Sequence, residues 1–262
     1  MDEYNVRTET YTAVPKLTMA ASSIIGTRKY QQDSYACIET PSGCLAVVCD
    51  GMGGLEGGEK ASSLVVRNLL EDYIRLTDGD IRRFLKVEAI KLDKKVFHIA
   101  GDNGEALGAG TTLAAVHVLD GRMSWVSVGD SKIYVLRSGE LHCIVREHNY
   151  RLLLNEMLSN GKLTKEQYHA EEGQAEALIS YLGIGELSLM DTDEKPLQLL
   201  AGDMVILCSD GLYKSLSEDK IKAVIADNDF DLQRAANELT ATALRSAARG
   251  QDNTTVILLR YS

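Results

Sequence analysis

The sequence predicts an α+β fold in which antiparallel β-sheets form the core and helices lie in separate groups outside them. Two observations predict this class. The apolar segments occur in the order of three strands, two helices, four strands, a polar insert, one strand, two helices and one strand, which is not the strand–helix alternation of a parallel sheet. Short polar turns also join successive strands, at Asp120-Gly121, Gly129-Asp130 and Ser138-Gly139.

The first half of the chain predicts seven strands and two helices. Three short apolar runs bounded by polar turns are expected to be strands, at 17–25, 34–39 and 44–50. Apolar residues then recur at helical spacing in two segments, 59–76 and 81–99. The segment 108–145 is rich in Val, Ile and Leu and is divided by the turns named above, so it predicts four further strands.

The second half begins with a more polar segment, 147–186, which is predicted to be largely helical. An apolar strand follows in "DMVILCSDG", 203–211, and two helices are expected at 217–226 and 232–248. Ser217 has the hydroxyl group that can cap the first of these helices. The chain closes with the strand "NTTVILLRY", 253–261.

The composition is that of an ordinary globular protein and excludes several functions. We interpret residues 1–262 as one domain, with 45% apolar and 25% charged residues. The net charge of −10 argues against a nucleic-acid partner. No apolar run approaches the ~18 residues of a membrane span, and the N-terminal segment has no signal-peptide pattern. The five cysteines form no C-x-x-C pair, which is typical of reduced thiols in a cytoplasmic protein.

Acidic residues recur where apolar strands begin or stop. There are five of these aspartates: Asp33, Asp50, Asp130, Asp210 and Asp252. Any one of them alone is best interpreted as a turn former. Carboxylates gathered at one end of packed sheets would repel one another unless cations lay between them, and oxygen ligands are those that Mg²⁺ or Mn²⁺ prefers. Together they therefore predict a metal centre.

The segment after Asp50 is unusually rich in glycine. Five glycines stand in eight positions: Gly51, Gly53, Gly54, Gly57 and Gly58. A turn needs only one or two, and each additional glycine costs conformational entropy. We therefore expect the backbone to approach another group closely here.

These segments resemble the metal-dependent protein phosphatases, the PPM or type 2C serine/threonine phosphatases, and especially their compact bacterial members. Six motifs occur in the family's order: "GTRKYQQDSY", "VVCDGMGGLEGGEKAS", "GAGTTLAAV", "VSVGDSKIYVLRSGEL", "ILCSDGLYKSL" and "GQDNTTVILL". They span the chain from about residue 20 to its end. The resemblance implies a sandwich of two antiparallel sheets flanked by pairs of helices.

The resemblance also assigns roles to the metal ligands. It implies two Mg²⁺ or Mn²⁺ ions bridged by Asp50, with the main-chain carbonyl of Gly51 as a further ligand. Asp210 and Asp252 match the aspartates that hold the first ion. In this family a metal-bridged hydroxide attacks the phosphorus atom, so no covalent phosphoenzyme is expected.

Two further residues match the family's catalytic positions. Asp33 corresponds to an aspartate that reaches metal-bound water, and Arg28 to the arginine that binds the substrate phosphate. A planar guanidinium suits this task because it can hold two phosphate oxygens at once. The expected substrate is phosphoserine or phosphothreonine in a protein, and the expected partner is a Ser/Thr kinase whose action it opposes. A monomer is expected.

Four positions depart from the family's pattern. Gln32 stands where many relatives have Glu, Met52 where some have a His proposed as general acid, and Lys132 where Arg is usual. Lys214 replaces an acidic residue that contributes to a third, weaker metal site, of which Asp130 is still present. Occupation of that third site is therefore left open.

The polar segment 147–186 corresponds to the family's variable flap beside the active site, where protein substrates are thought to be discriminated. His148 and His169 lie near or in it and are expected to be packing or surface residues.

Two alternative functions stay open: a pseudophosphatase that acts as a scaffold, and a hydrolase of small phosphate esters. The presence of all four principal aspartates argues against the first, and the lack of a nucleotide-binding motif against the second.

Overall fold

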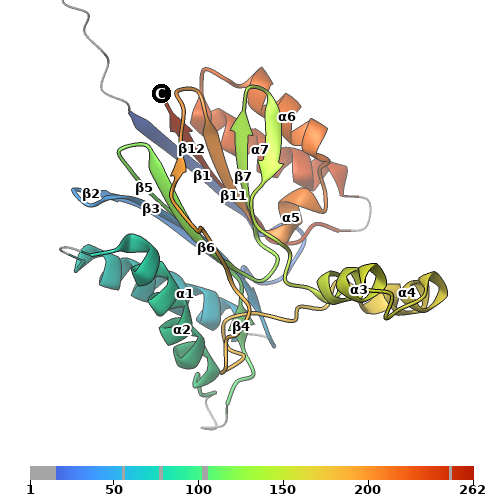
Figure 1. Cartoon of the computed structure of the whole chain (residues 1–262). Helices are drawn as coiled ribbons and strands as arrows, with labels where there is room; N and C mark the ends of the chain where they lie inside the picture. The colour runs from blue at the N-terminus through green and yellow to red at the C-terminus, as the bar shows by residue number, and fades with distance from the viewer. Residues whose placement is uncertain (1–15, 55–56, 77–78, 102–105, 248–249) are drawn as a thin grey trace, which may run out of the picture.

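Two antiparallel β-sheets lie face to face in the computed structural model, which describes residues 16–54, 57–76, 79–101, 106–247 and 250–262 (Figure 1). The first sheet has the strand order β1 (Leu17–Ile24), β12 (Thr254–Tyr261), β11 (Met204–Cys208), β7 (Lys132–Arg137) and β8 (Glu140–Cys143). The second has the order β10 (Leu197–Gln198), β6 (Arg122–Val128), β5 (Leu113–Leu119), β3 (Gly43–Met52) and β2 (Asp33–Thr40). Two short strands join the second sheet, β4 (Gly110–Thr111) beside β3 and β9 (Asp191–Thr192) beside β6.

Apolar side chains are buried on both faces of the second sheet, as the residues of β3 show. Its residues Cys44, Ala46 and Val48 pack into the space between the two sheets. The alternate residues face the helices: Leu45, Val47 and Cys49. Because both faces of the strand are buried, its sequence is an unbroken apolar run and not an alternation of apolar and polar residues.

Helices cover the outer face of each sheet (Figure 1). The second sheet is covered by α1 (Gly57–Ile74) and α2 (Ile81–Phe97), and the first by α5 (Asp210–Tyr213), α6 (Glu218–Asp227) and α7 (Leu232–Ser246). The Ser217 side chain caps α6 by accepting a hydrogen bond from the Lys220 amide, as the sequence predicts. The fold class is thereby confirmed.

Two of the predicted hairpin turns have left-handed backbone conformations. Asp120 and Gly121, with φ of 49° and 71°, join β5 to β6. Ser138 and Gly139, with φ of 52° and 83°, join β7 to β8. Two positive φ values in succession match the right-handed twist of the flanking strands, which explains the Asp-Gly and Ser-Gly pairs.

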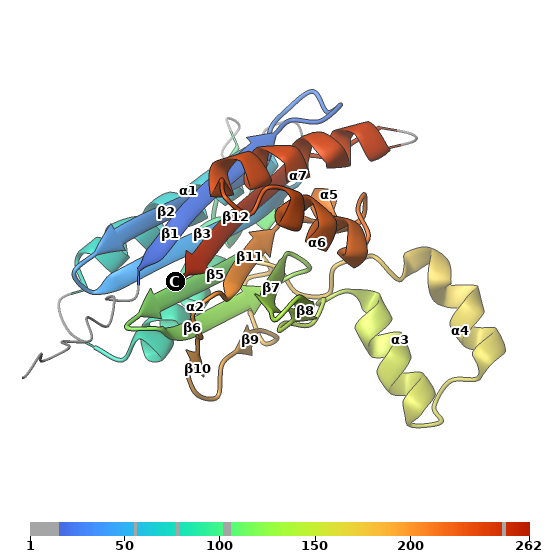
Figure 2. The ribbon, with the colours of Figure 1, turned by 90° about the horizontal axis from the view of Figure 1, so that it is seen from above.

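The flap segment 147–186 projects from the side of the sandwich (Figure 2). Its first half is helical, with α3 (Tyr150–Ser159), α4 (Lys165–Glu171) and a 3₁₀ turn, Glu172–Gln174. The prediction of a largely helical segment is wrong for residues 175–186, which form no helix. Gly183 and Gly185 have φ of 110° and 90° there, and their amides, with that of Leu187, donate to the buried carboxylate of Asp93.

Other differences from the sequence prediction are small. The short strands β9 and β10 and the single turn of α5 were not expected. The strand β3 continues past Asp50 to Met52 because Gly51 and Met52 pair with β4. The helix α7 ends at Ser246, and residue 248 of its predicted range lies outside the described residues. Within the part of the chain that the structure describes, no helix is long and apolar enough to cross a membrane.

Candidate metal centre

Asp33 and Asp50 lie opposite each other where β2 pairs with β3. Both are on the side of the second sheet that faces the first. The backbone of Asp50 is held on both sides, since its amide donates to Thr112 Oγ1 over 2.9 Å and its carbonyl accepts from Thr111 Oγ1 over 2.9 Å. These contacts leave the carboxylate as the part of Asp50 that is free to act.

Asp33 links the two sheets at this end of the sandwich. Its Oδ2 atom accepts hydrogen bonds from Ser209 Oγ at 2.8 Å and from Thr255 Oγ1 at 2.7 Å, and both donors belong to the first sheet or follow it. Its Oδ1 atom is buried and has no hydrogen-bond partner among the described residues. One oxygen thus fixes the side chain, and the other can serve as a ligand.

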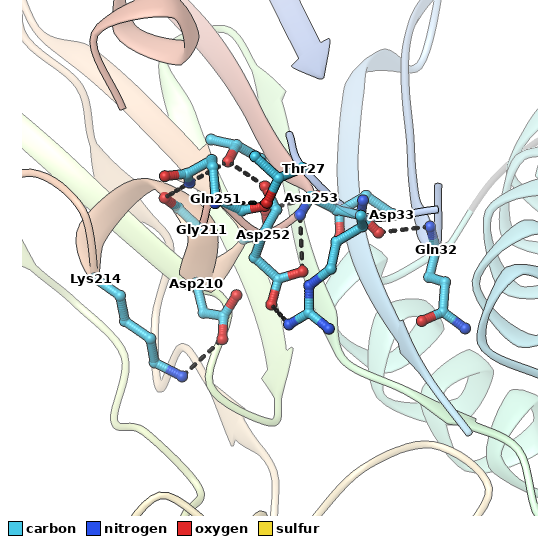
Figure 3. A network of polar contacts seen from close by, with 12 residues as sticks. Thr27, Gln32, Asp33, Asp210, Gly211, Lys214, Gln251, Asp252 and Asn253 are labelled. Carbon is cyan, nitrogen blue, oxygen red and sulfur yellow. Dashed lines mark hydrogen bonds and ion pairs between the residues drawn. The ribbon is translucent and has the colours of Figure 1, made fainter. Parts of the chain in front are cut away.

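The first sheet contributes Asp210 and Asp252, which follow β11 and precede β12. Because these strands are neighbours, the two side chains lie near each other (Figure 3). Gln251 Nε2 donates to the Gly211 carbonyl over 2.6 Å and so ties the two loops together. The Oδ1 atom of Asp210 is also buried without a partner in the described structure.

Asn253 holds the loop that carries Arg28. Its Nδ2 atom donates to the carbonyls of Ile25 and Tyr30, and its Oδ1 accepts from the amide of Gln32. These hydrogen bonds engage both polar atoms of the Asn253 side chain in supporting the loop.

The pKa of Asp50 shows how closely the carboxylates gather. Burial raises this pKa well above its usual range, and the negative charges of four other aspartates raise it further: Asp33, Asp210, Asp130 and Asp252. The other four predicted aspartates therefore lie close enough to Asp50 to act on its charge. Burial likewise raises the pKa of Asp33, although the hydrogen bonds from Thr255 and Ser209 partly offset this.

Two basic side chains enter the cluster. Arg28 Nη2 lies 2.5 Å from Asp252 Oδ2. Lys214 Nζ lies 2.6 Å from Asp210 Oδ2 (Figure 3). It also lies 3.6 Å from Asp130 Oδ2. No three His, Cys, Asp or Glu side chains of the described ranges converge closely enough to hold an ion. The guanidinium of Arg28 and the ammonium of Lys214 each pair with a carboxylate oxygen of the cluster.

Asp130 follows β6 and is buried beside Lys214. Burial first, and the charge of Asp210 second, raise the pKa of Asp130 to about 6. Tyr213 donates from its hydroxyl to the Asp130 carbonyl over 3.1 Å, which fixes the backbone there. The carboxylates of Asp130 and Asp210 thus both face the ammonium group of Lys214.

The glycine-rich segment brings backbone groups together, as expected. A Cβ atom on Gly51 would lie 2.1 Å from the Gly58 carbonyl oxygen and 2.6 Å from that of Gln32. A side chain at position 51 is therefore excluded by backbone atoms that cannot easily move. The side-chain amide of Gln32 also donates to the backbone carbonyls of Gly53 and Gly54.

The donor set fits hard divalent cations. It consists of aspartate oxygens and a glycine carbonyl, and two of its carboxylate oxygens, Asp33 Oδ1 and Asp210 Oδ1, are buried without a partner among the described residues. Unpaired buried carboxylate oxygens are costly unless a cation neutralises them. Oxygen-only ligation suits Mg²⁺ or Mn²⁺ and disfavours Zn²⁺, which prefers nitrogen and sulfur.

Several supporting residues were missed from the sequence. Ser209 directly precedes Asp210, and Thr255 is two residues after Asn253. This nearness to the site motifs was the only signal in the sequence that they could support the site. His148, expected to be a packing or surface residue, is fully buried; its Nδ1 accepts from the Gly129 amide, and its Nε2 lies 3.3 Å from Asp191 Oδ1.

The family described as "Protein phosphatase 2C" matches residues 22–248. The chain belongs to this family. The resemblance inferred from the six motifs is thereby confirmed, and the chain is a protein phosphatase of the 2C type.

Relatives with similar sequences carry consistent names. Protein phosphatase PhpP of Streptococcus pneumoniae is 28% identical over 218 residues, which cover 82% of this chain and 85% of PhpP. Serine/threonine phosphatase stp of Listeria monocytogenes is 28% identical over 219 residues, which cover 82% of this chain and 83% of that protein.

Solved structures of 2C-type phosphatases have the same fold. The S. agalactiae serine/threonine phosphatase superposes with a TM-score of 0.79 at 28% identity, covering 94% of this chain and 99% of that one. The catalytic domain of the phosphatase PstP, solved in complex with two manganese ions, superposes with a TM-score of 0.74 at 28% identity, covering 94% and 99% of the two chains.

Proposed function

We propose that this 2C-type phosphatase hydrolyses phosphoserine and phosphothreonine in proteins with two Mg²⁺ or Mn²⁺ ions at the aspartate cluster. The observation that carries the proposal is the pair of buried, unpartnered carboxylate oxygens on Asp33 and Asp210 within a group of five aspartates. The names of the relatives supply the class of substrate, and the PstP complex with two manganese ions supports the class of cofactor.

Each acidic residue would have a distinct task. Asp50, on β3 between the other carboxylates, would bridge the two ions, and the Gly51 carbonyl would be a further ligand. Asp210 and Asp252 would hold one ion from the first sheet. Asp33, fixed by Ser209 and Thr255, would orient the attacking water from its free Oδ1 atom. When bound, the ions would lower the pKa of coordinated water so that it is a nucleophile near neutral pH.

Arg28 would bind the phosphate group. Its side chain is 61% exposed, and its guanidinium pairs with Asp252 alone among the described contacts. An exposed guanidinium at the rim of an anionic site can turn from a carboxylate to a phosphate and neutralise charge on its oxygens. Exchange of Asp252 for the substrate phosphate is the step that this geometry allows.

We further propose a third, weaker cation site at Asp130. Lys214 lies between Asp130 and Asp210, where it supplies one positive charge. An ammonium near a divalent ion repels it, so a third ion would bind weakly and exchange with solvent.

The biological setting is also a proposal. We infer a single phosphatase domain over residues 1–262, acting as a cytoplasmic monomer on the products of a Ser/Thr kinase. The names of the relatives, which are protein phosphatases, support a protein substrate.

The test is release of phosphate from a phosphothreonine peptide and from a small aryl phosphate, each with and without Mn²⁺. The proposal predicts metal-dependent turnover of the peptide. Turnover of the small ester with no turnover of any phosphopeptide would favour the small-ester hydrolase. Metal binding without turnover of either substrate would favour a scaffold.

A further inference from the structure

Three sulfur atoms meet at the open side of the sandwich, away from the aspartate cluster. Met19 Sδ lies 3.0 Å from Cys37 Sγ and 3.2 Å from Cys44 Sγ, and the two Sγ atoms are 3.8 Å apart. We call Met19, Cys37 and Cys44 the sulfur triad. Its members come from β1, β2 and β3, so the triad joins the edge strand of the first sheet to the edge of the second.

The triad lies beside a surface cavity. Cys44 is 2% exposed, whereas Met19 and Cys37 are half-buried at the margin of the core between the sheets. A cavity of about 310 Å³ adjoins Cys44, and Glu39 is among its lining residues. Glu39 is the cross-strand partner of Cys44, so a carboxylate lies beside the sulfur atoms.

The two thiols have no evident role in the phosphatase reaction. Cys37 is four residues from Asp33 along β2, a separation of roughly 13 Å at the usual rise of a strand. The hydrogen bond to Cys37 and burial raise the pKa of the Cys44 thiol, so it is protonated and a poor nucleophile at neutral pH. Cysteine and methionine commonly pack as apolar side chains, but here three sulfur atoms from three strands are in mutual contact and so also form a set of soft donors.

The donor set identifies the class of ligand. Thiolate and thioether sulfur are soft ligands that select Cu(I), whereas Mg²⁺ and Mn²⁺ require oxygen. Zn²⁺ would need a fourth ligand to complete a tetrahedron. A trigonal ion with metal–sulfur bonds of about 2.3 Å separates its sulfurs by about 4 Å. The triad comes within about an ångström of this geometry, and the half-buried Met19 and Cys37 can shift outward to reach it.

We propose that the sulfur triad is a binding site for one Cu(I) ion. Binding displaces the thiol protons of Cys37 and Cys44, forms two copper–thiolate bonds and one bond to the Met19 thioether, and releases two protons. The product carries one net negative charge, and the oxidation state of copper does not change. The ion ties β1 to β2 and β3 and thereby clamps the two sheets together.

The experiment is an anaerobic titration of the fully reduced protein with Cu(I) supplied from its complex with bicinchoninate, a chromogenic chelator. We expect one ion per chain to be taken from the chelator. Cys37→Ser should weaken this binding at least a hundredfold, and Met19→Leu about tenfold, since the first loses a thiolate and the second a thioether. Cys143→Ser, at an exposed thiol outside the triad, is the matched control and should bind as the wild type does.

Two further readouts separate the site from the fold and from catalysis. X-ray absorption should show three sulfur ligands in the wild type and two in Met19→Leu, a substitution that nearly conserves volume and so should fold. Cu(I) should also raise the melting temperature of the wild type but not of Cys37→Ser. If Cys37→Ser and Cys143→Ser compete with the chelator as well as the wild type does, or if fewer than three sulfurs bind copper in the wild type, the proposal is wrong. No result of this titration bears on the phosphatase function, because no manganese or phosphopeptide is used.

Discussion

Replacement of Lys214 by glutamine should tighten the binding of Mn²⁺. The ammonium occupies Asp210 Oδ2 at 2.6 Å and stands 3.6 Å from Asp130, so an ion that needs either carboxylate must compete with it. Burial lowers the pKa of Lys214, but the attraction of Asp210 more than offsets this and leaves the pKa raised. The side chain is therefore charged at every pH at which the enzyme would be assayed.

The size of the effect follows from the exposure of the pair. Two unit charges about 4 Å apart attract by about 1 kcal/mol in water and by about 4 kcal/mol at the effective dielectric constant of a protein surface. The side chain of Lys214 is 41% exposed and that of Asp210 18%, which places the pair between these limits. A loss of competition worth about 1.4 to 2.8 kcal/mol lowers the dissociation constant about tenfold to a hundredfold.

The assay is calorimetric titration of Mn²⁺ into wild type, Lys214→Gln and Lys214→Asp. The aspartate variant should bind more tightly still and reach its full rate at a lower metal concentration. Lys222→Gln, which breaks the exposed pair with Asp219 in α6, loses the same charge away from the site and serves as the control. A dissociation constant for Lys214→Gln within twofold of that of Lys222→Gln would refute the competition argument.

Three other substitutions test separate parts of the site. Arg28→Ala should raise the KM for a phosphopeptide at least tenfold with a smaller change in kcat, as steady-state kinetics would show; an unchanged KM would remove Arg28 from phosphate binding. Asp130→Asn should keep two tightly bound Mn²⁺ per chain in calorimetry yet slow phosphopeptide hydrolysis, and a wild-type rate across a Mn²⁺ titration would make Asp130 a turn residue only. Thr255→Val should lower the free energy of unfolding by about 2 kcal/mol in denaturant melts, because it removes a buried hydrogen bond to the Asp33 carboxylate. Equal stability would contradict the role of Asp33 in linking the two sheets.

Most of the strands and helices, and the positions of the acidic residues at strand ends, could be predicted from the sequence because both depend on short local patterns. Apolar periodicity determines strands and helices, and Asp-Gly or Ser-Gly pairs determine the hairpin turns at Gly121 and Gly139. The motifs around Asp50, Asp210 and Asp252 are likewise short and contiguous. Their assembly at one end of the sandwich then follows from strand order.

The contacts across the fold could not be predicted in this way. Ser209 and Thr255 lie 176 and 222 residues from Asp33, and no local pattern announces that their hydroxyls meet its carboxylate. The second half of the flap, which is not helical, depends on Asp93 of the distant helix α2. The carboxylate of Asp93 accepts hydrogen bonds from three backbone amides at the end of the flap. Periodicity reports which face of a segment is apolar but not which distant polar group will satisfy its backbone.

The central claim is that the aspartate cluster binds divalent metal for phosphatase chemistry, and one measurement tests it most directly. Phosphate release from a phosphothreonine peptide is followed for wild type and Asp50→Asn over a Mn²⁺ titration, with a chelator as the starting point and melting temperatures recorded in parallel. The wild type should be inactive in chelator, gain activity with Mn²⁺, and be stabilised by about 2.7 kcal/mol when free Mn²⁺ is ~100 times the dissociation constant. Asp50→Asn should stay folded and inactive at every Mn²⁺ concentration. Activity that survives the chelator, or full activity in Asp50→Asn, would contradict the account.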